Sequence, residues 1–241
     1  MEDIDWRIKA TAKVSKDQVN PWGTDFKKDA QLKMVSVVKL PKGRTLTLPV
    51  PNVVALYINN SENCWSKSWD FRKRYNIDAS LRKEVTFEKD KDAFDVLELI
   101  ASSVIFAYTA IEAFCNDSIP EDHEFWHLKR SEIILEKSDK KAIERYFSLE
   151  SKLNNILPEL FEVQKPKGQS PVWVNYKKLK NCRDQLIHVK SSETRSADIN
   201  KKNLWDLLFE IRKPHMLAKD IFDWFLKNAP GKPLWYTKYP K

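Results

Sequence analysis

The stretch that decides the fold spans residues 99–115 and reads LIASSVIFAYTAIEAFC. It is the most apolar part of the chain, yet it holds two serines, a threonine and Glu112. A membrane-spanning helix needs about 20 mostly apolar residues, so this stretch is short for a span. We therefore expect a buried core helix over about residues 92–116, with Asp90 or Asp92 as its N-cap.

Helical periodicity continues beyond this core helix to about residue 228. The pattern predicts helices in EFWHLKRSEIILEK (124–137), KKAIERYFSLESKLNNILPELF (140–161), SPVWVNYKKLKNCRDQLIHVK (170–190) and NLWDLLFEIRKPHMLAKDIFDWFLKN (203–228). Pro214 should interrupt the last of these, because proline cannot donate a helical hydrogen bond. The second part of the chain is therefore predicted to be a helical domain.

The region before residue 88 has a different pattern, which predicts strands. KMVSVVKL (33–40) and RTLTLPV (44–50) flank PKG, a typical tight connection; NVVALYI (52–58) and KEVTFE (83–88) are further candidates. The fold class expected is α+β, mainly α, with a β-containing region over residues 1–88 and a helical domain over residues 89–241. The aromatic tail APGKPLWYTKYPK (229–241) should pack on its own body or on a second subunit.

Composition narrows the class of protein. The 241 residues are 42% hydrophobic, which is enough for a buried core, and their formal net charge of +8 permits an acidic partner such as RNA. Cys64, Cys115 and Cys182 have no paired spacing and fit a reducing compartment. The start MEDIDWRIKA has no secretory pattern. We expect a cytoplasmic protein with no membrane segment.

The predicted helix over residues 170–190 carries an arginine on its apolar side. Val172, Tyr176, Leu179 and Leu186 form one stripe on a helical wheel, and Arg183 falls in its middle. A buried, unpaired guanidinium is costly, so Arg183 requires a carboxylate or an anionic ligand. The surrounding residues 165–190 hold seven basic residues and one acidic residue, which favours an anion.

Two sets of residues are candidate partners of this arginine. Glu112 is the best internal carboxylate, and with Tyr108 and Asn116 it forms a polar stripe along the core helix. On the arginine's own helix, Asp184 and His188 are four residues apart and should point the same way. A carboxylate beside an imidazole orients the ring and favours its charged form.

Arg183 and His188 themselves should lie about 140° apart on a helix. Either the arginine stem reaches round the helix, or a second copy of the helix completes the site.

These residues resemble a known motif. Arg183 and His188, separated by four residues, resemble the Rx4–6H motif of the HEPN superfamily, and FAYTAIEAFCND (106–117) is similar to the first long helix of many HEPN proteins. The resemblance covers about residues 90–228. It implies a helical bundle that forms a homodimer and sets two motifs across a cleft. Many members are metal-independent endoribonucleases of toxin–antitoxin, CRISPR or phage-defence systems.

The resemblance also implies roles for single residues. His188 would transfer the proton of the ribose 2′-OH or of the leaving 5′-oxygen, Arg183 would hold the scissile phosphate, and Asp184 would occupy the polar position after the arginine, where the family often has asparagine. Such a site needs no metal or cofactor. Tyr108, Glu112 and Asn116 would support it, and the neighbouring cations would bind RNA: Lys177, Lys178, Lys180 and Lys190.

The alternative is a non-catalytic HEPN-like module that binds RNA or another protein. Under either hypothesis the expected partners are RNA, a second copy of the chain, and an antitoxin or another defence-system component.

Two further sequence motifs suggest other binding sites. HEFWH (123–127) matches the zinc-binding HExxH pattern, but its flanks are polar and no third ligand is evident, so a surface helix is the simpler interpretation. CWSKSWDFRKRYNI (64–77) interleaves aromatic residues with cations, which suits stacking of single-stranded RNA. Ordinary core aromatics with a solvated basic edge explain the second pattern equally well.

Overall fold

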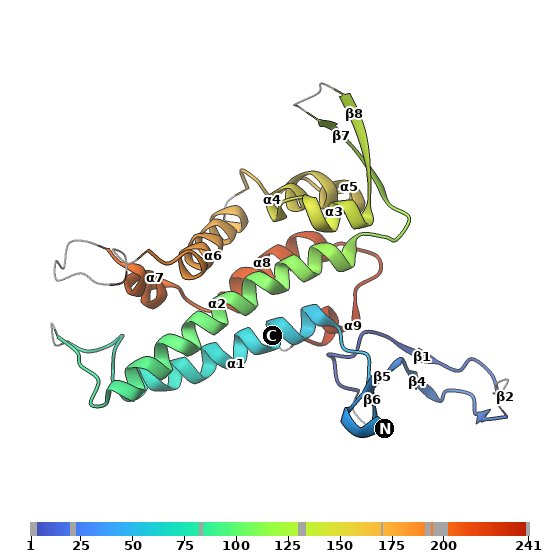
Figure 1. The fold of residues 1–241 in the computed structure, drawn as a ribbon, viewed down its shortest axis with the longest axis horizontal. Coiled ribbons are helices and arrows are strands. Elements are labelled where there is room, and N and C mark those ends of the chain that lie inside the picture. Colours follow the sequence, from blue (N-terminus) through green and yellow to red (C-terminus); the bar gives the residue numbers. More distant parts are fainter. Residues whose placement is uncertain are drawn as a thin grey trace. The chain divides into compact units, whose positions relative to one another are not determined.

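The computed structural model describes residues 4–19, 23–81, 84–129, 134–169, 171–190, 194 and 202–239. The chain is α+β and mainly α, and it divides into two compact units (Figure 1). One comprises residues 1–56 and 230–241, and the other comprises residues 57–229. The boundary expected near residue 88 lies inside the second unit, between helices α1 (Val53–Arg74) and α2 (Asp90–Ser118).

The described part of the first unit contains three antiparallel strand pairs. They are β1 (Thr11–Lys13) with β4 (Gln31–Lys33), β2 (Gln18–Val19) with β3 (Asp25–Phe26), and β5 (Val35–Lys39) with β6 (Thr45–Pro49). The β5–β6 pair confirms the predicted hairpin. Its connection is the short turn η1 (Pro41–Gly43), where Lys42 and Gly43 have φ angles of 61° and 71°. Glycine adopts this left-handed conformation at little cost, which explains its position at the turn.

The aromatic tail belongs to the first unit. It forms the short helix α9 (Leu234–Lys238), in which Trp235 is buried. Tyr239, just after α9, packs edge-on against Trp6 with ring centroids 5.3 Å apart. The tail therefore packs on its own chain, which is the first of the two alternatives considered for it.

Helix α1 corrects the strand predicted from NVVALYI. The Asn52 side chain caps the helix by accepting a hydrogen bond from the Ala55 backbone N–H at 2.9 Å. The apolar run then continues with helical spacing, because Ile58, Trp65 and other residues three or four apart are buried along one face. A seven-residue apolar run does not distinguish a strand from the first turns of a buried helix. CWSKSWDFRKRYNI lies largely in the same helix.

Helices α1 and α2 approach each other at a pair of buried serines (Figure 1). The Ser61 hydroxyl donates to the Ser103 carbonyl at 2.7 Å, and the Ser103 hydroxyl donates to the Ser61 carbonyl at 2.8 Å. Small side chains permit this close crossing, and the reciprocal bonds satisfy both hydroxyls. Helix packing thus explains Ser103, one of the two serines inside the apolar stretch.

Helix α2 confirms the predicted core helix. Its N-cap is Lys89 rather than Asp90 or Asp92, and Lys89 makes no side-chain capping bond. Among the described residues, α2 is the one helix that is long and apolar enough to cross a membrane by length and composition. It packs against α6, α7 and α8, and Ile100, Val104 and Ile111 are fully buried. Of the most apolar 18-residue window of α2, 44% is buried within the fold.

The other helices of the second unit follow α2 in the chain, and α6, α7 and α8 pack against it. They are α3 (Lys140–Tyr146), α4 (Leu149–Ser151), the π-helical turn η2 (Lys152–Ile156), α5 (Leu157–Phe161), α6 (Val172–Ile187), α7 (Leu204–Glu210) and α8 (Pro214–Leu226). The interruption predicted at Pro214 is confirmed, since α7 ends before it and α8 begins with it.

The helix predicted over residues 124–137 is wrong. This segment forms the antiparallel pair β7 (Glu124–Lys129) and β8 (Ile134–Asp139), and residues 130–133 lie outside the described part (Figure 1). Phe125 and His127 lie on one face of β7 and contact Phe147. Trp126, between them in the sequence, lies on the other face and is 56% exposed. Side chains that alternate between two faces are typical of a strand, so this segment forms strands and not a helix. The strand predicted from KEVTFE is also wrong, because residues 84–88 form no strand.

Candidate functional site on helix α6

Helix α6 turns its apolar side toward α2 and α8. Tyr176, Leu179 and Cys182 are buried, so the buried stripe passes through Cys182. Arg183 lies at the edge of this stripe, and its side chain is 32% exposed. The expectation of a fully buried guanidinium is therefore wrong. One position further along the helix turns a side chain by about 100°, which moves it from the core to the rim.

Arg183 is held by a ring and a carboxylate. Its guanidinium lies 4.8 Å from the ring centroid of Tyr108 on α2, and its Nη1 donates to Asp184 Oδ1 at 3.1 Å. The other oxygen of Asp184 accepts from Lys180 Nζ at 2.6 Å. Burial raises the pKa of Asp184, but the hydrogen bonds from Lys180 and Arg183 lower it further than burial raises it. The net effect is a pKa below the usual range. The aspartate is therefore ionised at neutral pH.

The tyrosine below the guanidinium is part of an aromatic stack. Tyr108 stacks on Tyr176 with ring centroids 6.4 Å apart, and Tyr176 stacks on Trp173 at 4.8 Å. Burial raises the pKa of both tyrosine hydroxyls, so both are neutral at physiological pH. Among the described residues, the Tyr176 hydroxyl has no hydrogen-bond partner. The stack is a rigid platform for Arg183 rather than a source of protons.

His188 occupies a different place from the one expected on a continuous helix. It is the C-cap of α6, with φ −112° and ψ 49°, and its backbone N–H donates to the Asp184 carbonyl at 2.9 Å. Its side chain is exposed and makes no hydrogen bond or ion pair with another described residue. The prediction that the Asp184 carboxylate orients the imidazole is wrong, because the helix ends before His188.

The predicted polar stripe on α2 is not one group of contacting side chains, because Tyr108, Glu112 and Asn116 have different surroundings. Glu112 is exposed and makes no ion pair with Arg183, so the internal pair predicted for that arginine is wrong. Asn116 serves another cation: its Oδ1 accepts from Lys152 Nζ at 2.8 Å. Lys152 is 2% exposed in the π-helical turn η2 and also donates to the Glu144 carbonyl at 3.0 Å. Of the three supporting residues, only Tyr108 contacts Arg183.

The four lysines expected to bind RNA divide into two groups. Lys177 pairs with Glu150 at 3.3 Å, and Lys180 pairs with Asp184 as described. Lys178 and Lys190 are exposed. Lys177 and Lys180 are therefore already paired with carboxylates of the same chain, and the basic character of residues 165–190 is weaker locally than the sequence indicates.

The HEFWH segment does not have the helical geometry that a zinc site of this type requires. His123 precedes β7 and His127 lies within it, whereas the motif needs both histidines one turn apart on a helix. Among the described residues, no group of three histidine, cysteine or acidic side chains could hold a metal ion. His127 instead packs its ring against Phe147.

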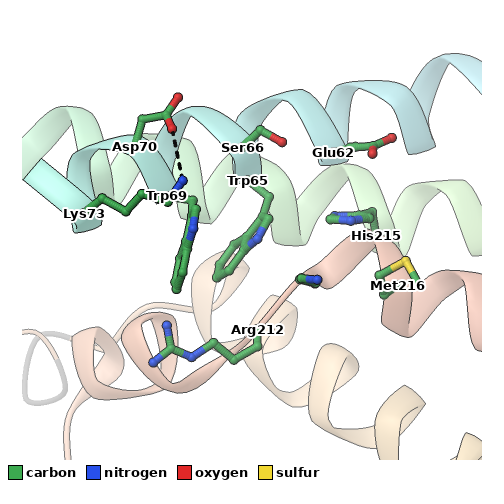
Figure 2. Close-up of a pocket in the computed structure, with 10 residues that line it drawn as sticks. Glu62, Trp65, Ser66, Trp69, Asp70, Lys73, Arg212, His215 and Met216 are labelled. Atoms are coloured by element: carbon green, nitrogen blue, oxygen red, sulfur yellow. Dashed lines mark ion pairs between the residues drawn. The ribbon is translucent and has the colours of Figure 1, made fainter. Parts of the chain in front are cut away.

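A second candidate site, which was not predicted from the sequence, brings aromatic, cationic and histidine side chains together. Trp65 and Trp69 of α1 line a pocket together with Arg212, which lies between α7 and α8, and His215, the second residue of α8 (Figure 2). The aromatic and basic pattern of residues 64–77 pointed to α1. Nothing in the sequence joined it to Arg212 or His215, because their contact depends on tertiary packing.

Comparison of the chain with protein-family models, with curated proteins and with solved structures found no match.

Proposed function

We propose that residues 90–228 form an HEPN-like helical domain that cleaves RNA without a metal ion, at a site completed by a second copy of the chain. The observation that carries the proposal is that a cation held by neighbouring side chains and a solvent-exposed imidazole both lie near the C-terminal end of α6. Arg183 is oriented by Tyr108 and Asp184 but remains 32% exposed, and His188 projects into solvent at the helix end.

The chemistry follows from what RNA supplies. The ribose 2′-OH is the nucleophile, so the protein must move a proton and stabilise the extra negative charge at phosphorus. An exposed imidazole can both accept and donate a proton, which suits the first task. A guanidinium suits the second, since its donors match phosphate oxygens. A homodimer would bring two copies of each group to one groove.

The test is cleavage of end-labelled RNA in EDTA by the purified chain. Cleavage should leave a 2′,3′-cyclic phosphate, and His188→Ala and Arg183→Ala should each lower the rate by at least about a hundredfold. Arg145→Ala is the matched control, because Arg145 also lies over a tyrosine, Tyr146, at 5.3 Å but on α3. Thermal melting of each variant verifies folding. Loss of cleavage in EDTA would contradict the mechanism.

Mixing the two inactive variants tests the second copy. If one site takes Arg183 from one subunit and His188 from the other, a mixed dimer of Arg183→Ala and His188→Ala subunits has one intact site. Partial activity should then return on mixing. Activity that is independent of protein concentration and never returns on mixing would contradict a site shared between subunits.

One observation favours a second candidate function, a non-catalytic module that binds RNA or a protein. Arg183 Nη1 already donates a hydrogen bond to Asp184 Oδ1 at 3.1 Å, and the negative charge of Asp184 would repel a phosphate bound at that position. Under this alternative, the wild-type chain leaves RNA intact but binds it, and Arg183→Ala weakens the binding. The cleavage assay and a filter-binding assay on the same RNA separate the two functions.

A further inference from the structure

A pocket of about 760 Å³ opens between α1 and the segment that joins α7 to α8 (Figure 2). We call it the tryptophan pocket. Its lining from α1 is Glu62, Trp65, Ser66, Trp69, Asp70 and Lys73, and from the other side Arg212, Lys213, His215 and Met216. Small-molecule sites usually have volumes of about 300–1,000 Å³, so this pocket has the size of a ligand site.

The wall on the α1 side is aromatic. Trp65 and Trp69 are four residues apart on α1, and their rings stack with centroids 6.1 Å apart and planes inclined by 25°. Figure 2 shows both rings directed from α1 toward the segment that carries Arg212. Two indoles stacked on each other form an apolar aromatic wall, and such a wall favours a planar aromatic ring.

The opposite wall is cationic. The Arg212 guanidinium lies 5.8 Å from the Trp69 ring centroid, and Lys213 is exposed beside it. Lys213 has a φ of 43°, an uncommon value for a residue with a side chain, and it is the N-cap of α8. This 13-residue helix has no side-chain cap hydrogen bond at its N-terminus. The positive end of its dipole therefore adds to the two cations.

A buried histidine lacks a partner in this pocket. His215 is 6% exposed, and its Nδ1 makes no hydrogen bond with any described residue. Burial, with a smaller effect from the charge of Lys213, lowers its pKa to about 4, so the ring is neutral at pH 7. A buried polar atom without a partner is rare in native proteins. His215 lines the pocket although its Nδ1 is covered, so a ligand that displaces the covering side chains would supply the missing hydrogen bond.

The polar groups are distributed unevenly along the pocket. Glu62 and Lys73 stand three turns apart on α1, which separates them by about 16 Å along the helix. Figure 2 shows His215 and Met216 toward the Glu62 end, with Lys73 at the opposite end and Arg212 between them. A carboxylate and a neutral imidazole thus lie at one end, whereas Lys73 and Arg212 lie toward the other. Lys73 pairs there with Asp70 at 3.9 Å (Figure 2), and Arg212 pairs with Asp78 at 2.5 Å.

We infer that the tryptophan pocket binds a planar aromatic anion of the size of a nucleoside monophosphate. The ring stacks on Trp65 and Trp69 and presents hydrogen-bonding edges to His215 and Glu62. Its anionic group binds Arg212, Lys213 and the N-terminus of α8. A free nucleotide and one nucleotide of a single-stranded RNA share this chemistry. The inference does not depend on Arg183 or His188.

The test is isothermal titration of the full chain with adenosine 5′-monophosphate, adenosine and ribose 5-phosphate. The nucleotide should bind at least about tenfold more tightly than either fragment, because the ring and the anion each contribute. Trp69→Ala should weaken nucleotide binding by about tenfold to a hundredfold, whereas Trp69→Phe keeps a stacking ring and most of the affinity. Trp126→Ala, on exposed β7, is the control and should have no effect.

Two further variants test the polar contacts. Arg212→Met should weaken binding of the nucleotide but not of adenosine, and it serves as the main variant if Trp69→Ala does not fold. His215→Asn retains a polar group near the Nδ1 position and should bind better than His215→Phe.

A short single-stranded oligonucleotide distinguishes the two sources. If it binds in a Trp69-dependent manner and the free nucleotide does not, the pocket takes a base from a strand. Trp69-dependent binding of the free nucleotide assigns a free ligand. Binding of neither probe, or binding that Trp69→Ala leaves unchanged, would overturn the inference, and equal affinity for adenosine and its monophosphate would overturn the assignment of an anion.

Discussion

The α6 site and the tryptophan pocket are built around the same pair of contacts, an arginine with an aromatic ring and an aspartate. Arg183 contacts Tyr108 and Asp184, and Arg212 contacts Trp69 and Asp78. The two sites differ in what surrounds the arginine. Arg212 borders a pocket of about 760 Å³ that contains a buried histidine, whereas Arg183 lies at the rim of a helix whose histidine is exposed.

A third arginine shows what these contacts do when water is excluded. Arg72 also binds Asp78, through Nε at 2.8 Å and Nη2 at 2.5 Å, and it lies 5.1 Å from the ring centroid of Phe209. Its side chain is only 2% exposed, against 32% for Arg183 and 48% for Arg212. Similar contacts are shielded from water at Arg72 and open to solvent at the other two arginines.

The largest expected effect is on the free energy of unfolding, and it separates Arg72 from Arg212. Arg72→Ala should lower the free energy of unfolding by about 3 kcal/mol, because it leaves Asp78 with less compensation and opens a cavity. Arg212→Met, which loses a half-exposed partner of the same aspartate, should cost less than about 1 kcal/mol. Urea unfolding of both variants measures the difference. Equal losses would show that burial does not separate the two arginines.

The next effect is a pH dependence that arises in the tryptophan pocket. The pKa of His215 is lowered from 6.5 to about 4 by burial, so the unfolded state binds more protons between these values. Stability from this group is complete above about pH 6.5 and falls as the pH drops toward 4, by roughly 2–3 kcal/mol. Unfolding at pH 4.5–7 should show this slope, and His215→Phe should reduce it. An unchanged slope in the variant would contradict the neutral, buried histidine.

The smallest effect should come from the α6 site. Asp184→Asn keeps the shape of the side chain but removes its ion pairs with Lys180 and Arg183. About a third of each side chain is exposed, so water screens these pairs, and the loss of unfolding free energy should stay below about 1 kcal/mol. Thermal melting provides the measurement. A loss as large as that of Arg72→Ala would place Arg183 with the structural arginines.

The helices with long periodic patterns could be predicted from the sequence. Residues 99–115 predicted α2, and Pro214 predicted the break between α7 and α8. Short segments failed for a physical reason: NVVALYI is equally apolar as a strand and as the first two turns of α1. The segment EFWHLK carried apolar residues at helical spacing, but its contact with Phe147 selects the alternating face of a strand.

The α6 site could be predicted in part. The sequence identified Arg183 as a cation in need of a partner, and Asp184 and Tyr108 are among the residues it named. It assigned Glu112 as the internal partner, but Glu112 faces solvent. It also extended the helix through His188, although α6 ends at Ile187. A one-residue difference in where a helix ends redirects every later side chain, and no local pattern fixes that residue.

The amino-acid order alone predicts that the chain is mainly α, that its core helix is α2, and that its late helix carries an arginine beside an aspartate. These properties depend on neighbours within about two helical turns, so periodicity reveals them. Only the tertiary structure decided that Arg183 rests on Tyr108, that Asn116 serves Lys152, and that the tryptophans of α1 face Arg212 and His215. Those contacts join segments that are remote in the chain, and packing between helices, not the local pattern, selects them.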